Sequence, residues 1–81
     1  ENNETSVYIK DLSEIEKLND KNKVTILILS HIKITTIPIK IFKLFNLQIL
    51  NLCANKITII PVDIGILLNL EKLLLSHNKI I

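Results

Sequence analysis

Residues 47–69 read LQILNLCANKITIIPVDIGILLN, and the residues before them follow the same pattern. Residues 24–46 read VTILILSHIKITTIPIKIFKLFN and align with that stretch without a gap, while residues 70–81 begin a third copy. Such self-similarity at a fixed period of about 23 residues is the signature of a repeat architecture. The columns that match are Val24, Leu47 and Leu70; Leu27, Leu50 and Leu73; Leu29, Leu52 and Leu75; Ile34, Ile57 and Ile80; Ile37 and Ile60; Pro38 and Pro61; Ile41 and Ile64; Leu44 and Leu67; and Asn46 and Asn69.

The first half of each copy alternates with period two, as a half-buried strand does. Leu27 and Leu29 point to one side, and the isoleucines that alternate with them point to the other. Stacked copies place 26–30, 49–53 and 72–76 side by side as a parallel sheet. The proline that follows in each full copy cannot donate to a sheet ladder, so the chain must return through an irregular or short 3₁₀ segment. The strands are then expected on the inner side of a curved stack.

The form common to the copies, seen most clearly in residues 47–69, is L-x-x-L-x-L-x-x-N-x-I-x-x-I-P-x-x-I-x-x-L-x-N. This pattern resembles the leucine-rich repeat family, and its I-P-x-x-I half is similar to the intracellular class of about 23 residues found in Ras-pathway scaffolds. The resemblance covers residues 24–81. It implies an α/β fold, a leucine-rich-repeat solenoid fragment with a parallel sheet on the concave side and irregular or 3₁₀ convex segments. The expected repeats are 24–46, 47–69 and the partial copy 70–81.

A column of asparagines follows the strands. Asn55 and Asn78 come where the chain turns, and an amide side chain can donate to and accept from the backbone groups that a turn leaves unpaired. Stacked asparagines would form a ladder. Ile32 occupies this column in the first copy and can do neither, so the first turn is expected to be built differently.

Residues 1–23 do not fit the repeat and are interpreted as an N-terminal cap that covers the apolar flank of the first copy. The alternation of 7–10 predicts a short strand, and Ser13 with Glu16 predicts a capping-box helix start. Leu12, Ile15 and Leu18 would share one face of that helix, ahead of a polar turn over residues 19–23. The third copy breaks off at residue 81, so we expect the natural protein to continue.

Composition disfavours several classes of function. The net charge is only +2, and all ten basic residues are lysines, whereas nucleic-acid-binding proteins usually concentrate Arg and Lys on one face. The longest charge-free stretch, residues 44–55, is shorter than the roughly 18 apolar residues of a membrane span. Cys53 has no second cysteine to pair with, which favours a reducing, cytoplasmic location.

Catalytic and metal sites find little support in the sequence. His31 and His77 share a column two strands apart, roughly 10 Å by strand spacing, which is too far for one zinc ion. Cys53 lacks a base oriented by a third group, as nucleophilic catalysis requires. We therefore expect no enzyme activity, no cofactor and no metal. Lys40 and Lys43 are interpreted as residues that keep an aliphatic convex segment solvated.

The outward face of the sheet is the best candidate for binding, because contiguous exposed apolar surface commonly marks an interaction site. The alternative interpretation is that β-branched residues stand there because they suit strands. Both interpretations stay open on sequence alone. The predicted partner-binding residues are Ile26, Ile28, Ile49, Asn51, Lys72 and Leu74.

The function expected from this face is binding of a protein partner. The resemblance to the family implies that the module belongs to a larger intracellular signalling or scaffold protein. The alternative is a structural spacer or regulatory segment attached to a catalytic domain outside this fragment. Extracellular recognition is a third hypothesis, and it predicts cysteine-rich caps on the complete protein.

Overall fold

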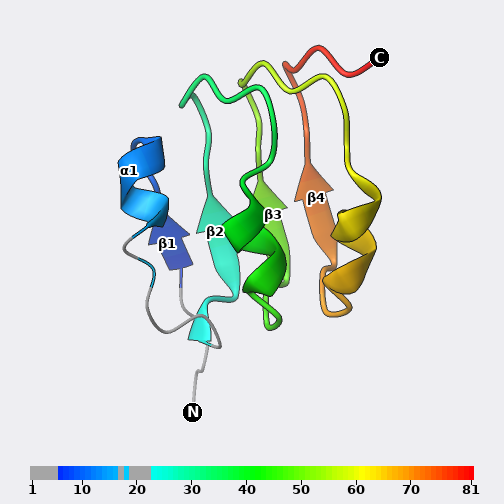
Figure 1. Cartoon of the computed structure of the whole chain (residues 1–81). Coiled ribbons are helices and arrows are strands. Elements are labelled where there is room, and N and C mark those ends of the chain that lie inside the picture. The colour runs from blue at the N-terminus through cyan, green and yellow to red at the C-terminus, as the bar shows by residue number, and fades with distance from the viewer. Residues whose placement is uncertain (1–5, 17, 19–22) are drawn as a thin grey trace.

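The computed structural model describes residues 6–16, 18 and 23–81. Within these residues, four strands form one parallel sheet, in the order β1-β2-β3-β4 (Figure 1). In the described part of the chain, the helix α1 and the 3₁₀ helices η2 and η3 lie between successive strands. The parallel sheet and the 3₁₀ segments that the repeat predicts are thereby confirmed. The elements are β1 (Ser6–Tyr8), α1 (Leu12–Ile15), β2 (Ile26–Ile28), η2 (Ile39–Lys43), β3 (Ile49–Asn51), η3 (Val62–Ile66) and β4 (Lys72–Leu74).

The repeat period sets the register of the sheet. Leu27 pairs with Leu50, and Leu50 pairs with Leu73, so one column of the repeat becomes one row across three strands. Leu27 and Leu50 are fully buried. A shift by one residue would turn these leucines to the outside, because side chains alternate between the two faces of a strand.

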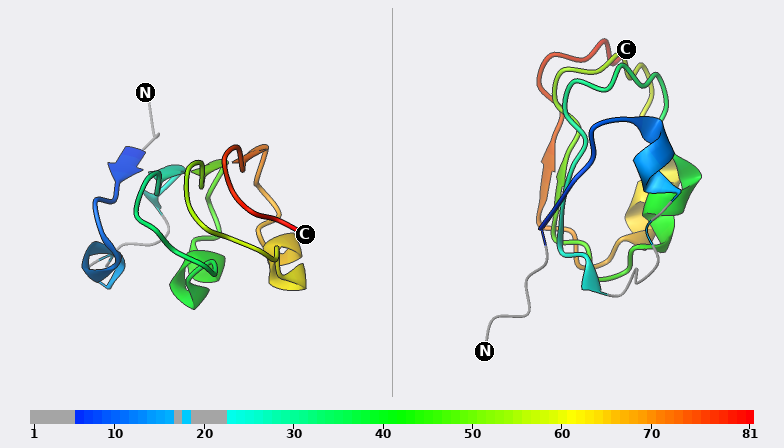
Figure 2. Two further views of the ribbon diagram at one scale, coloured as in Figure 1. Left: turned by 90° about the horizontal axis from the view of Figure 1, so that it is seen from above. Right: turned by 90° about the vertical axis from the view of Figure 1, so that its left-hand side faces the viewer.

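The sheet forms one side of the molecule, and the helical segments form the other. Figure 2 shows the strands close together, with α1, η2 and η3 fanned more widely apart. The sheet side is therefore the inner, concave side of the stack. Aliphatic side chains fill the space between the two sides. The largest fully buried ones are Ile15, Leu27, Leu29, Ile41, Leu44, Leu47, Leu50, Leu52 and Ile57.

Asn55 bonds to the repeat before it, as the predicted ladder requires. Its side chain is only 6% exposed. The Oδ1 atom accepts from the backbone N–H groups of Ile32 at 3.0 Å and Ile34 at 3.3 Å. The Nδ2 atom donates to the carbonyl oxygens of Leu29 at 2.9 Å and Leu52 at 3.0 Å. One side chain therefore joins its own turn to the turn of the preceding repeat.

Asn78 makes three of these four contacts one repeat further along. Its Oδ1 atom accepts from the N–H of Ile57 at 3.0 Å, and its Nδ2 atom donates to the carbonyl oxygens of Leu52 at 2.8 Å and Leu75 at 3.0 Å. Two consecutive turns are thus held by the same device, which confirms the asparagine ladder.

The turns after the strands need a left-handed residue. His31, Ala54 and His77 share a column, and their φ angles are 60°, 60° and 61°. The first turn has a further left-handed residue, Lys33, with a φ of 62°. The corresponding residues of the two asparagine-containing turns do not adopt this conformation. The expectation that a turn carrying Ile32 in the asparagine column is built differently is confirmed.

β1 extends the sheet beyond the first repeat. Tyr8 pairs with Ile28, and the N–H of Ile9 donates to the carbonyl of Ile28 at 2.9 Å. Ile9 and Ile15 are each 2% exposed and belong to the same core cluster as the repeat leucines. This part of the chain therefore covers the flank of the first repeat. The domain division at residue 23 stays a prediction.

The helix start predicted at Ser13 with Glu16 is wrong. The N-cap of α1 is Asp11, whose carboxylate accepts from the N–H of Ser13 at 2.9 Å. Oε1 of Glu14 accepts from the N–H of Lys10 at 2.7 Å. Aspartate caps a helix as well as serine does. The helix consequently begins earlier than the Ser-x-x-Glu pattern indicates.

The shared face predicted for this helix is also only partly correct. Ile15 is buried, but Leu12 is 50% exposed, and Leu18 lies after the end of α1. In the predicted polar turn over residues 19–23, positions 19–22 are outside the described residues.

Gly65 lies inside η3, where a side chain would have room. Its φ is not positive, and a β-carbon built on it would meet no atom within 4 Å. We expect Gly65→Ala to raise the free energy of unfolding by about 0.5 kcal/mol, because alanine restricts the unfolded chain without straining the folded one. Urea titration followed by circular dichroism would measure this, and a lowered midpoint would contradict it.

Candidate functional site

The six predicted site residues lie on the face of the sheet that points away from the core. Each belongs to β2, β3 or β4, and the register aligns equivalent residues on neighbouring strands, about 4.8 Å apart. Their side chains therefore form a continuous surface across three strands. The two rows are Ile26, Ile49 and Lys72, and Ile28, Asn51 and Leu74.

β1 adds a fourth member to each row, which sequence reasoning missed. Ser6 pairs with Ile26, and Tyr8 pairs with Ile28. Tyr8 is 65% exposed. Tyrosine is enriched in protein interfaces because it combines an apolar ring with a polar tip. The alternation of residues 7–10 predicts the strand but not its register, because β1 has no copy in the repeat. These eight residues are called the sheet face below.

Five of the eight sheet-face residues are apolar or aromatic, and each strand contributes at least one of them. The three isoleucines are half-buried, whereas Tyr8 and Leu74 at the two sides are more exposed, Leu74 at 41%. Lys72 is exposed and is the sole charged residue of the eight. The sheet face therefore offers an apolar strip with one cation beside it.

Asn51 has a structural role as well. Its Oδ1 atom accepts from the hydroxyl of Ser30 at 3.2 Å and from the N–H of Cys53 at 3.0 Å. These bonds fix the amide and join the ends of β2 and β3. A partner would therefore meet an oriented amide in the middle of the sheet face.

The histidines and the cysteine lie in or beside the turns that follow the strands. In the part of the chain that the structure describes, no three His, Cys, Asp or Glu side chains gather where they could hold a metal ion. His31 and His77 adopt left-handed backbone conformations, which histidine tolerates better than most residues. The left-handed conformation required in these turns is a sufficient reason for histidine at both positions. Cys53 is a half-buried free thiol.

The side opposite the sheet exposes large apolar side chains, although Lys40 and Lys43 were expected to keep it solvated. The most exposed of these side chains, Val62, is 92% accessible. Strand alternation explains the sheet face, but 3₁₀ segments have no such simple pattern, so this exposure was not predicted. In η2, η3 and the segments beside them, the large exposed apolar side chains are Ile39, Phe45, Ile59, Val62, Ile66 and Leu68. We call them the convex surface.

Comparison with known proteins identifies the family. The leucine-rich repeat family model matches residues 22–80, which is most of the chain. The chain therefore belongs to the leucine-rich repeat family, whose domains generally mediate protein–protein interaction and are typically non-catalytic. Among curated proteins, none matches this chain. No helix in the described residues is long and apolar enough to cross a membrane.

Proposed function

We propose that the chain binds a protein partner through its sheet face, as one module of a larger intracellular signalling or scaffold protein. The observation that carries the proposal is the apolar part of the sheet face, to which each of the four strands contributes: Tyr8, Ile26, Ile28, Ile49 and Leu74. Apolar surface of this kind commonly marks an interaction site. A partner that covers it would remove half-exposed isoleucines from water without reorganising the sheet.

The intracellular assignment rests on two supports. The I-P-x-x-I half of the repeat is similar to the intracellular class of about 23 residues. Cys53 is a free thiol, and a reducing cytoplasm keeps thiols in that state. Cysteine-rich caps on the complete protein would contradict a cytoplasmic location.

A charge in the middle of the sheet face is expected to weaken binding. Ile28→Glu or Ile49→Glu should each cost about 2 kcal/mol of affinity, a factor of roughly 30, because central apolar contacts dominate interface energies. Tyr8→Ala tests the residue that β1 contributes. Pull-down with the full-length protein from its source cell would identify partners, and titration calorimetry with each captured protein would measure affinity.

Leu68→Glu is the matched control. It makes the same change from aliphatic to acidic at a convex position that is 89% exposed. Circular dichroism of every variant would confirm that it is folded. If the sheet-face variants retain the partners of the wild type, the proposal is wrong and the spacer alternative is favoured.

A further inference from the structure

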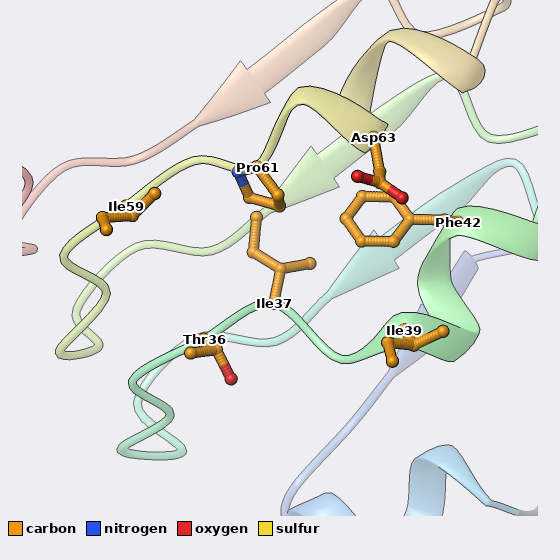
Figure 3. A pocket seen from close by; sticks show the side chains of 7 residues that line it. All are labelled: Thr36, Ile37, Ile39, Phe42, Ile59, Pro61 and Asp63. Atoms are coloured by element: carbon orange, nitrogen blue, oxygen red, sulfur yellow. The ribbon is translucent and has the colours of Figure 1, made fainter.

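A groove runs between the two repeats on the side opposite the sheet. It encloses about 480 Å³ and is mainly apolar. Ligand pockets in proteins commonly have about 300–1,000 Å³, with an apolar lining and few polar groups. Figure 3 shows residues of the first repeat on one side and of the second on the other. The lining residues are Thr36, Ile37, Ile39, Phe42, Ile59, Pro61 and Asp63.

Phe42, in η2, is 9% exposed and is the one aromatic residue of the groove lining. Its ring lies beside the carboxylate of Asp63, which belongs to η3 (Figure 3). Ile39 and Ile59 stand at the groove and are 77% and 68% exposed. A ligand there would bury aliphatic surface that water now covers.

Asp63 supplies the one charge of the groove lining. Lys40 occupies the same column one repeat earlier, and it is already paired. Its Nζ atom lies 3.4 Å from Oε1 of Glu16 and donates to the carbonyl of Glu16 at 3.0 Å. Within the described residues, Asp63 forms no such ion pair. Asp63 is exposed, so a cationic group of a ligand can reach its carboxylate.

A neighbouring groove differs in charge. It lies between α1 and the first repeat, encloses about 320 Å³, and has Lys33, Thr35 and Thr36 in its lining. A cationic ligand would meet a lysine there, and a carboxylate in the larger groove. The two grooves are therefore expected to discriminate between ligands by charge.

We propose that the groove between η2 and η3 binds an apolar peptide segment that carries a basic residue. An aliphatic side chain of the peptide fills the hollow over Phe42, and the adjacent Lys or Arg pairs with Asp63. This site is independent of the sheet face, so the chain has two surfaces for partners of different chemistry.

The test is a titration of the complete isotope-labelled chain with a capped peptide, acetyl-Gly-Ile-Leu-Arg-Ser-amide, followed by NMR. Backbone signals of residues 36–42 and 59–63 should shift. Asp63→Asn should weaken binding about fivefold, as expected for loss of an exposed ion pair. Asp63→Lys should reverse the preference in favour of the same peptide with Glu in place of Arg.

Glu71→Gln is the matched control, because it removes another exposed carboxylate outside the groove and should leave the dissociation constant unchanged. Equal binding of the Arg and Glu peptides, or no shift at millimolar peptide, would overturn the proposal. If the same backbone signals shift when the chain is diluted without peptide, the groove binds a second copy of the chain instead. Shifts with phosphatidylserine vesicles in place of the peptide would assign it to a lipid surface.

Discussion

Asn55→Ala is expected to lower the free energy of unfolding by about 3 kcal/mol. The substitution removes the acceptor for the N–H groups of Ile32 and Ile34 and a donor to the carbonyl of Leu29. Ile34 and Leu29 are buried, so water cannot readily replace the lost partner. Equilibrium urea unfolding followed by circular dichroism would measure the change.

Asn69→Ala is the matched control for this substitution. Asn69 is exposed, and its amide donates a single hydrogen bond, to the carbonyl of Phe45 at 3.0 Å. We expect a loss of about 0.5 kcal/mol, since water can satisfy both groups in the variant. Equal urea midpoints for the two variants would show that the asparagine ladder does not contribute to stability.

The leucine columns could be predicted because each is sampled more than once in the sequence. Leu27 and Leu50 share a repeat column and the same place in the strand alternation. Both are fully buried in the paired strands. The ladder could be predicted for the same reason, since Asn55 and Asn78 share a column. Repetition turns a weak local signal into a reliable one.

The cap has no second copy, and there the prediction was less accurate. Asp11 and Ser13 are both good capping residues two positions apart, and each is followed three residues later by a glutamate, Glu14 or Glu16, so local pattern alone does not decide between them. The backbone instead places Asp11 at the cap. Tyr8 was missed as a surface residue because its place depends on pairing with Ile28, which is a tertiary contact.

The convex surface shows another limit of sequence reasoning. Ile41 shares a repeat column with Ile64 and is fully buried, whereas Ile39 belongs to no such column and is 77% exposed. The groove with Asp63 is lined by residues of both repeats, so no motif in either repeat alone indicates it.

Leu50→Ala is expected to have the largest effect on stability, about 4 kcal/mol. Leu50 is fully buried at the centre of the sheet, with Leu27 on one neighbouring strand and Leu73 on the other. Its truncation would lose apolar burial and leave a cavity that the packed strands cannot easily close. A domain of this size has roughly 4–12 kcal/mol of stability in total. The variant would therefore be near the limit of folding at room temperature.

Two further variants keep this prediction testable if Leu50→Ala does not fold. Leu50→Val, a smaller truncation, should cost about 1 kcal/mol and leave a measurable urea transition. Leu73→Ala removes the same atoms from the same column one strand further, where the side chain is only half-buried. It should cost about half as much as Leu50→Ala, because part of the removed surface already faces water. Equal losses at Leu50 and Leu73 would show that burial in this column does not set its contribution to stability.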